Sequence, residues 1–196
     1  MVSRRAFLAG AAWLFATPAT RGLASSHTGG EPPWQRLRQG GLVLLMRHAS
    51  TQPGLGDPPG YRLDDCRSQR NLSPAGLEEA RRVGEKLRSE RVPIGRVYSS
   101  PWCRCRDTAI AAFGRAEDWE PLSSIFDFPE RERDFSERVR KRIGVLGRKP
   151  SRDNVVMVTH NVNIAALTRH SVAPCEIVVV RPDGCCGLRP LERVRL

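Results

Sequence analysis

The stretch Gly41-Leu-Val-Leu-Leu-Met-Arg-His-Ala-Ser-Thr51 decides the fold of this chain. Residues 42–46 are all apolar, and Arg47 and His48 follow them directly. A short continuous apolar run is typical of a strand that is buried on both faces of a sheet. In open α/β sheets, ligands bind beyond the carboxyl ends of the strands. We therefore expect Arg47 and His48 to project from the end of a buried strand into a pocket.

Strand-like and helix-like segments alternate along the rest of the chain. Apolar runs predict strands at about residues 154–159 and 176–181, short extended segments at 97–98 and 122–126, and an edge strand at 188–196. Helical spacing and helix-start signals predict helices at about residues 73–91, 101–113, 135–146 and 161–169. This alternation predicts an α/β fold, with a mostly parallel central sheet that is flanked by helices on both faces. Residues 41–196 are expected to form a single domain.

The N-terminus has the features of an export signal. A pair of arginines, Arg4 and Arg5, precedes a small apolar region at residues 6–16, and cleavage is predicted after Ala19 or Ala24. The start resembles a twin-arginine signal. The apolar region is shorter than the ~20 residues that a membrane-spanning helix needs, and no later segment is long enough. We therefore expect a periplasmic or otherwise exported protein without an integral membrane segment.

The mature chain is expected to begin with a flexible lead-in and to be basic. Residues 1–24 would be removed, and residues 25–40 contain paired glycines and paired prolines, which are typical of a linker. The net charge is +11 for the whole chain and +8 without the three arginines of the signal. A basic surface suits phosphate esters, anionic lipid head groups or nucleic acid. Because no aromatic residues are interleaved with the charges, nucleic acid is the least favoured of these partners.

Three predicted strands lead into residues that can bind an anion. Besides Arg47 and His48, the second strand leads into a helix whose first turn carries Arg104, and the third is followed by His160. Such strand-to-helix junctions direct free N–H groups and the positive end of a helix dipole toward one crevice. An arginine fork can also donate two parallel hydrogen bonds to phosphate oxygens. The pattern therefore predicts a site for a tetrahedral dianion.

Three sequence blocks carry a resemblance to a known family. They are Leu45-Met-Arg-His-Ala-Ser-Thr51, Ser99-Ser-Pro-x-x-Arg-x-x-x-Thr-Ala109 and Val158-Thr-His-Asn161. In order and spacing they resemble the signatures of the histidine phosphatase superfamily, which includes the phosphoglycerate mutase-like enzymes. The loop at 57–73, together with Trp102-Cys103-Arg104, resembles an exported branch that is similar to the lipopolysaccharide-core heptose-phosphate phosphatases.

The resemblance implies a phosphomonoesterase that needs neither a metal nor a cofactor. His48 would attack phosphorus as a neutral imidazole, and water would hydrolyse the resulting phosphohistidine. Arg47, Arg104 and His160 would hold the phosphoryl oxygens and balance the charge of the transition state. A mutase is less favoured, because the diphosphorylated cofactor of such enzymes is cytosolic. The alternative function is a non-catalytic binder of phosphorylated envelope components.

The proton donor for the leaving group is open. One branch of the family has an acid directly after the second histidine, where this chain has Asn161. Another branch has a glutamate downstream of the second-block arginine; Glu130 fits that position, and Asp127 and Glu132 are alternatives. Glu130 could equally open the following helix, where acidic residues are favoured. Ala49 stands where the family commonly has glycine, a change that costs little unless the backbone there has a positive φ.

The long loop at residues 51–71 is predicted to border the site. It is rich in Gly, Pro and Asp, and loops of this length are usually functional or disordered. We assign Thr51, Arg70 and Asn71 to substrate binding; a polar loop that anchors the next helix is the alternative. The substrate would be a phosphorylated small molecule or an envelope glycan.

Six cysteines in an exported chain suggest disulfides. None has C-x-x-C spacing, and only His27 and His170 are otherwise unassigned, so a zinc site is improbable. If the three blocks converge, the segments that carry Cys66 and Cys103 border the same crevice, which makes these two the preferred pair. Trp102 either forms a wall of the pocket or is a buried core residue.

Overall fold

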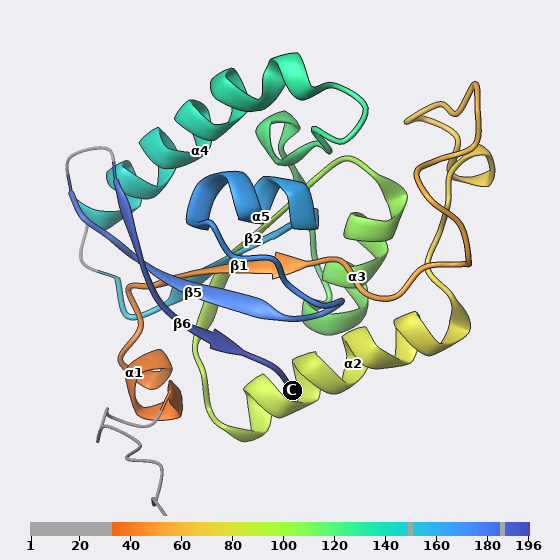
Figure 1. Ribbon diagram of the computed structural model, residues 1–196. Coiled ribbons are helices and arrows are strands. Elements are labelled where there is room, and N and C mark those ends of the chain that lie inside the picture. The colour runs from red at the N-terminus through yellow and green to blue at the C-terminus, as the bar shows by residue number, and fades with distance from the viewer. Residues whose placement is uncertain (1–32, 149–150, 185–186) are drawn as a thin grey trace, which may run out of the picture. The chain divides into compact units, whose positions relative to one another are not determined.

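The computed structural model describes residues 33–148, 151–184 and 187–196 (Figure 1). The predicted signal at 1–24 and the first part of the lead-in lie outside these ranges. Residues 31–196 form one compact unit. No helix in the described ranges is long and apolar enough to cross a membrane.

A single sheet of six strands has the order β3-β2-β4-β1-β5-β6. The strands are β1 (Val43–Arg47), β2 (Ile94–Ser99), β3 (Glu117–Asp118), β4 (Asn154–Thr159), β5 (Ile177–Pro182) and β6 (Leu188–Val194). Strands β1 to β4 pair in parallel, whereas β5 is antiparallel to β1, and β6 is antiparallel to β5. The prediction of a mostly parallel sheet is therefore confirmed.

In the described ranges, five α-helices surround the sheet. They are α1 (Pro33–Gln39), α2 (Pro74–Ser89), α3 (Cys103–Phe113), α4 (Glu132–Gly147) and α5 (Asn161–Thr168). In strand β1 successive side chains point to opposite faces, so Leu44 and Met46 pack in a core with α2 and α3. Val43 and Leu45 instead join a second core that contains residues of α4 and α5. The sheet thus lies between two helical layers, as predicted and as Figure 1 shows.

Two local predictions were wrong. Residues 33–39, part of the predicted flexible lead-in, form helix α1, because Leu37 is only 1% exposed and anchors the segment in the core. The extended segment predicted at 122–126 follows a 3-10 turn at Glu120–Leu122 and belongs to no strand. The Leu122 and Ser123 carbonyls accept hydrogen bonds from side chains of β4 and α5 instead of a neighbouring strand.

Helix α2 begins as its sequence predicts, and its start contacts the first signature block. Pro74 is the first helical residue, and the Ser73 hydroxyl accepts a hydrogen bond from the Gly76 N–H at 3.0 Å. The Ser73 N–H donates to the carbonyl of Ser50 at 3.0 Å. A Cβ at Gly76 would overlap that same carbonyl. The glycine therefore allows the helix to lie directly against the backbone that follows His48.

We expect Gly76→Ala to lower the free energy of unfolding by about 1–3 kcal/mol, because the added methyl group meets backbone that cannot rotate away. Denaturant unfolding monitored by circular dichroism measures the change. Ala75→Ser, at the adjacent exposed position, is the control and should leave stability nearly unchanged. Equal stability of Gly76→Ala and wild type would contradict the close contact.

Candidate active site

The carboxyl ends of β1, β2 and β4 meet at one edge of the sheet. A pocket of about 200 Å³ opens there, and its lining includes all four predicted anion-binding residues: Arg47, His48, Arg104 and His160. The His48 and His160 ring centroids lie 5.4 Å apart at an interplanar angle of 67°. The side chains predicted from three separate blocks therefore share one small cavity.

His48 is held in a single neutral tautomer. Its Nδ1 lies 2.8 Å from the carbonyl oxygen of Ala49, which can only accept a hydrogen bond, so Nδ1 carries the proton. The Nε2 lone pair is then free for attack on an electrophile. The pKa of His48 is lowered to about 3, mainly by burial and also by the charges of Arg104, Arg47 and Arg70, while the hydrogen bond to Ala49 opposes the shift.

His160 is also buried and neutral. Its Nε2 lies 2.9 Å from the Ser100 hydroxyl and 3.5 Å from the sulfur of Cys105. Burial is the main cause that holds the pKa of His160 well below its ordinary value, and His48 and the neighbouring arginines add to the effect. The Trp102 ring meets the His160 ring edge-on at 5.6 Å. These contacts fix the orientation of the His160 imidazole, which lines the pocket.

The two signature arginines each present an unused donor. Arg47 Nη1 donates to the carbonyl of Val172 at 2.7 Å, and Arg104 Nη1 donates to both oxygens of Asp57 at 2.8 and 2.9 Å. The Nε atoms of both arginines are buried without a hydrogen-bond partner in the described part of the chain. Because an unsatisfied buried donor costs about 1–3 kcal/mol, a phosphoryl oxygen would be a favourable partner for each.

Asp57 lines the pocket, although the sequence analysis included it only in the loop that carries the resemblance and gave it no role. Its side chain is 1% exposed and forms a buried ion pair with Arg104. It also accepts hydrogen bonds from the Trp102 Nε1–H at 3.1 Å and from the Arg70 N–H at 2.9 Å. Asp64 and Asp65 occupy the same loop but form more exposed ion pairs with nearby arginines. No sequence signal separates these three aspartates.

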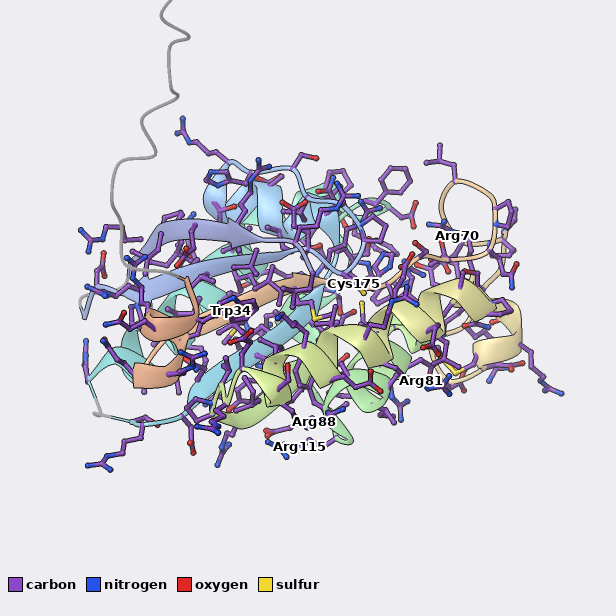
Figure 2. All side chains as sticks on the ribbon, turned by 90° about the horizontal axis from the view of Figure 1, so that it is seen from below. Trp34, Arg70, Arg81, Arg88, Arg115 and Cys175 are labelled. Carbon is purple, nitrogen blue, oxygen red and sulfur yellow. A yellow bond between two sulfur atoms is a disulfide. The ribbon has the colours of Figure 1, made fainter. Side chains whose placement is uncertain are left out.

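Only one of the three loop residues assigned to the substrate lines this pocket. Arg70 lines the pocket and belongs to the long loop that precedes α2, where Figure 2 labels it. Thr51 lies behind that side chain and accepts a hydrogen bond from Arg70 Nη1 at 2.6 Å. Asn71 instead donates to the carbonyl of Cys66 and does not line the pocket. Thr51 and Asn71 are therefore placed as supports of the loop, because local hydrogen bonds turn them away.

Of the three candidate proton donors, only Asp127 lines the pocket. Glu130 lies in the 3-10 turn Pro129–Arg131, and Glu132 begins α4; both line a separate surface hollow against α4. The structure does not bring Glu130, the preferred assignment, into the pocket, because the chain forms the turn at Pro129–Arg131 directly after Phe128. Asp127 forms no hydrogen bond or ion pair with any described residue, which leaves its carboxyl group available.

The loop is covalently joined to the second block. Cys66 and Cys103 form a disulfide with a Cα–Cα distance of 5.7 Å, which is the predicted pair. Beside it, Gln69 accepts a hydrogen bond from the Cys103 N–H at 3.0 Å. Trp102 is buried behind the pocket wall and contacts Asp57 and His160. Within the described ranges, no group of three or more His, Cys, Asp or Glu residues could hold a metal.

The backbone at Ala49, in the first block, is compatible with alanine. Ala49 is not among the residues with positive φ, so glycine is not required there. Its N–H donates to the Thr108 hydroxyl at 3.0 Å, and that hydroxyl donates to the carbonyl of Arg104 at 2.7 Å. The first and second blocks are thereby linked through one threonine.

Comparison with known proteins agrees with this geometry. Residues 43–125 match the sequence model of the histidine phosphatase superfamily (branch 1). The resemblance to the histidine phosphatase superfamily is confirmed. No curated protein sequence matches the chain.

Two solved structures share the fold at low sequence identity. One is the protein histidine phosphatase SixA complexed with tungstate, which is 20% identical, with a TM-score of 0.54 and coverage of 78% of this chain and 96% of that chain. The other is phosphoserine phosphatase from Entamoeba histolytica in complex with 3-phosphoglyceric acid, which is 12% identical, with a TM-score of 0.55 and coverage of 79% and 97%. The exported branch stays a prediction.

We expect the His48 ring to stay neutral in the folded protein at pH 5, because its pKa is lowered to about 3. The unfolded state binds this proton near pH ~6.5. Lowering the pH from about 6.5 toward 3 therefore favours unfolding. The stability that the protein has above pH ~6.5 is lost progressively over this pH range. Nuclear magnetic resonance of labelled histidine rings in folded and urea-unfolded protein measures both titrations. A folded midpoint near 6.5 would contradict the burial argument.

Proposed function

We propose that the chain is an exported, metal-independent phosphomonoesterase that works through a phosphohistidine at His48. The observation that carries the proposal is the His48 tautomer: a neutral imidazole has its Nε2 lone pair free in a pocket with two unused arginine donors. Phosphoryl transfer mainly requires positioning and stabilisation of charge on the phosphoryl oxygens. The guanidinium groups of Arg47 and Arg104 provide both.

Catalysis would proceed in two displacements. In the first, His48 Nε2 forms a bond to phosphorus while the bond from phosphorus to the ester oxygen breaks, and Asp127 donates its proton to that oxygen. In the second, the Asp127 carboxylate takes a proton from water, whose oxygen bonds to phosphorus and releases the Nε2 of His48. Phosphate then leaves, and Asp127 is again protonated. Arg47, Arg104 and His160 would hold the phosphoryl oxygens throughout.

The proposed substrate is a small phosphate ester or the phosphate ester of an envelope sugar. The outer lining of the pocket includes Phe126 and Leu55, which are 49% and 87% exposed, together with Asp127 and Arg70. An aromatic ring beside polar side chains suits a leaving group with one apolar face and several hydroxyl groups. Export through a twin-arginine signal, with action in the periplasm, is part of the same proposal.

His48→Ala should reduce hydrolysis of a chromogenic phosphomonoester by roughly 10³-fold or more, because the nucleophile is lost. The assay is run on the mature chain with and without a chelator, and acid-labile phosphate is measured on the quenched protein. His170→Ala, outside the pocket, is the control and should retain activity. Full activity of His48→Ala, or loss of activity with chelator, would rule out the mechanism. Phosphate binding without turnover would favour the non-catalytic binder.

Asp127→Asn should slow hydrolysis of an alkyl phosphate by about 10²-fold or more, because a poor leaving group needs the donated proton. The same variant should lose much less activity on an aryl phosphate whose leaving group is already acidic. Steady-state kinetics on both esters measures the difference, with Glu130→Gln as the control. Equal losses on both esters, or a larger loss in Glu130→Gln, would refute the role of Asp127.

A further inference from the structure

Asp57 places a negative charge inside a pocket that otherwise suits an anion. Both of its oxygens lie within 2.9 Å of Arg104 Nη1, and the ion pair is almost completely buried. Within the described residues, neither Arg47 nor Arg70 forms an ion pair with a carboxylate. A phosphatase needs positive charge in the pocket that binds its substrate. The pairing of the buried Arg104 is one reason for a carboxylate there, but it does not explain why this arginine alone of the three is paired.

Asp57 is poorly arranged to act as an acid or base. Its two oxygens accept four hydrogen bonds, two from Arg104 and one each from the Trp102 side chain and the Arg70 backbone. A carboxylate offers about four acceptor positions, so none is left for a proton or a water molecule. The fixed contribution of Asp57 to the pocket is therefore its negative charge.

That charge matches the pocket to its ligand. Arg47, Arg70 and Arg104 contribute three positive charges to the lining, and the two imidazoles are neutral. With Asp57, and with Asp127 carrying the proton that it is proposed to donate, these groups have a net charge of +2, which balances the two negative charges of a phosphate dianion. Without it, the extra positive charge would act on substrate, transition state and product alike. Such uniform binding lowers KM and slows product release without raising kcat.

We propose that Asp57 limits the affinity of the pocket for free phosphate, and so sets KM and the rate of product release. The effect on KM and on product release rests on the proposed function. The affinity for phosphate does not, because it can be measured without any reaction. In the alternative role, Asp57 only positions Arg104, and its removal would weaken the binding of every oxyanion.

The test compares wild type with Asp57→Asn, which keeps the shape of the side chain and removes its charge. Asp64→Asn is the matched control, because Asp64 lies in the same loop but its side chain is 71% exposed in a surface ion pair. Isothermal titration with inorganic phosphate gives Kd, and kinetics on a phosphomonoester give kcat and KM. We expect Kd and KM to fall roughly tenfold or more in Asp57→Asn, with kcat equal or lower. An unchanged or raised Kd would overturn the proposal.

Thermal unfolding with and without phosphate gives a second readout. Asp57→Asn should be less stable than wild type in phosphate-free buffer, because Arg104 is left as an unpaired buried charge. Saturating phosphate should stabilise the variant more than wild type, since tighter binding gives a larger shift. An equal shift in both proteins would contradict the proposal.

Two further variants keep the proposal testable if Asp57→Asn does not fold. Asp57→Ser also removes the charge and should bind phosphate more tightly, whereas Asp57→Glu retains it and should bind within about threefold of wild type. Tighter binding in Asp57→Glu, or none in Asp57→Ser, would overturn the role of the charge. If wild type binds phosphate but hydrolyses no ester, the proposed function fails, while the titrations still decide the role of Asp57.

Discussion

The parallel pairing of β1 with β4 is the constraint on which the site depends. Arg47 lies opposite Thr159 in this register, so the next residue of each strand, His48 and His160, leaves the sheet at the same level. The His48 N–H extends the ladder by donating to the Thr159 carbonyl at 3.0 Å. Two rings that are far apart in the sequence are therefore held 5.4 Å apart by backbone hydrogen bonds. A shift of this register by one residue would turn one of the rings toward the opposite face.

Burial determines how the polar groups at this edge behave. It removes the proton from both imidazoles, because the charged form of a ring loses its hydration inside the protein. The arginines are only partly paired, because the Nε atoms of Arg47 and Arg104 have no hydrogen-bond partner among the described residues. The same environment increases the effect of the Asp57 carboxylate on a bound anion, because its charge is little screened by solvent.

Much of this arrangement could be predicted from local sequence, and the reasons are physical. The apolar runs at residues 42–46 and 155–158 are typical of buried strands, and the residues directly after parallel strands lie at one edge of the sheet. Helix α1 was missed because it is short and contacts the core through few side chains, of which only Leu37 is fully buried and Trp34 partly so. The segment at 122–126 was misread because burial and apolar character do not distinguish a strand from a buried loop.

The parts of the site that lie on loops were the least predictable. Thr51 and Asn71 were expected at the substrate, but hydrogen bonds within the loop direct them elsewhere. Asp127 and Glu130 differ by three positions, and only the turn at Pro129–Arg131 decides which carboxylate faces the pocket. Asp57 was overlooked, because its importance depends on Arg104, a residue that is distant in sequence.

The disulfide between Cys66 and Cys103 has a consequence for how molecules enter and leave. It fastens the long loop to the first residue of α3, directly beside the arginine that faces the pocket. A segment attached in this way can move less far from the pocket than a loop that is held at its two ends alone. We therefore expect the exchange of molecules to depend more on how strongly the interior holds an anion than on a large opening of this loop.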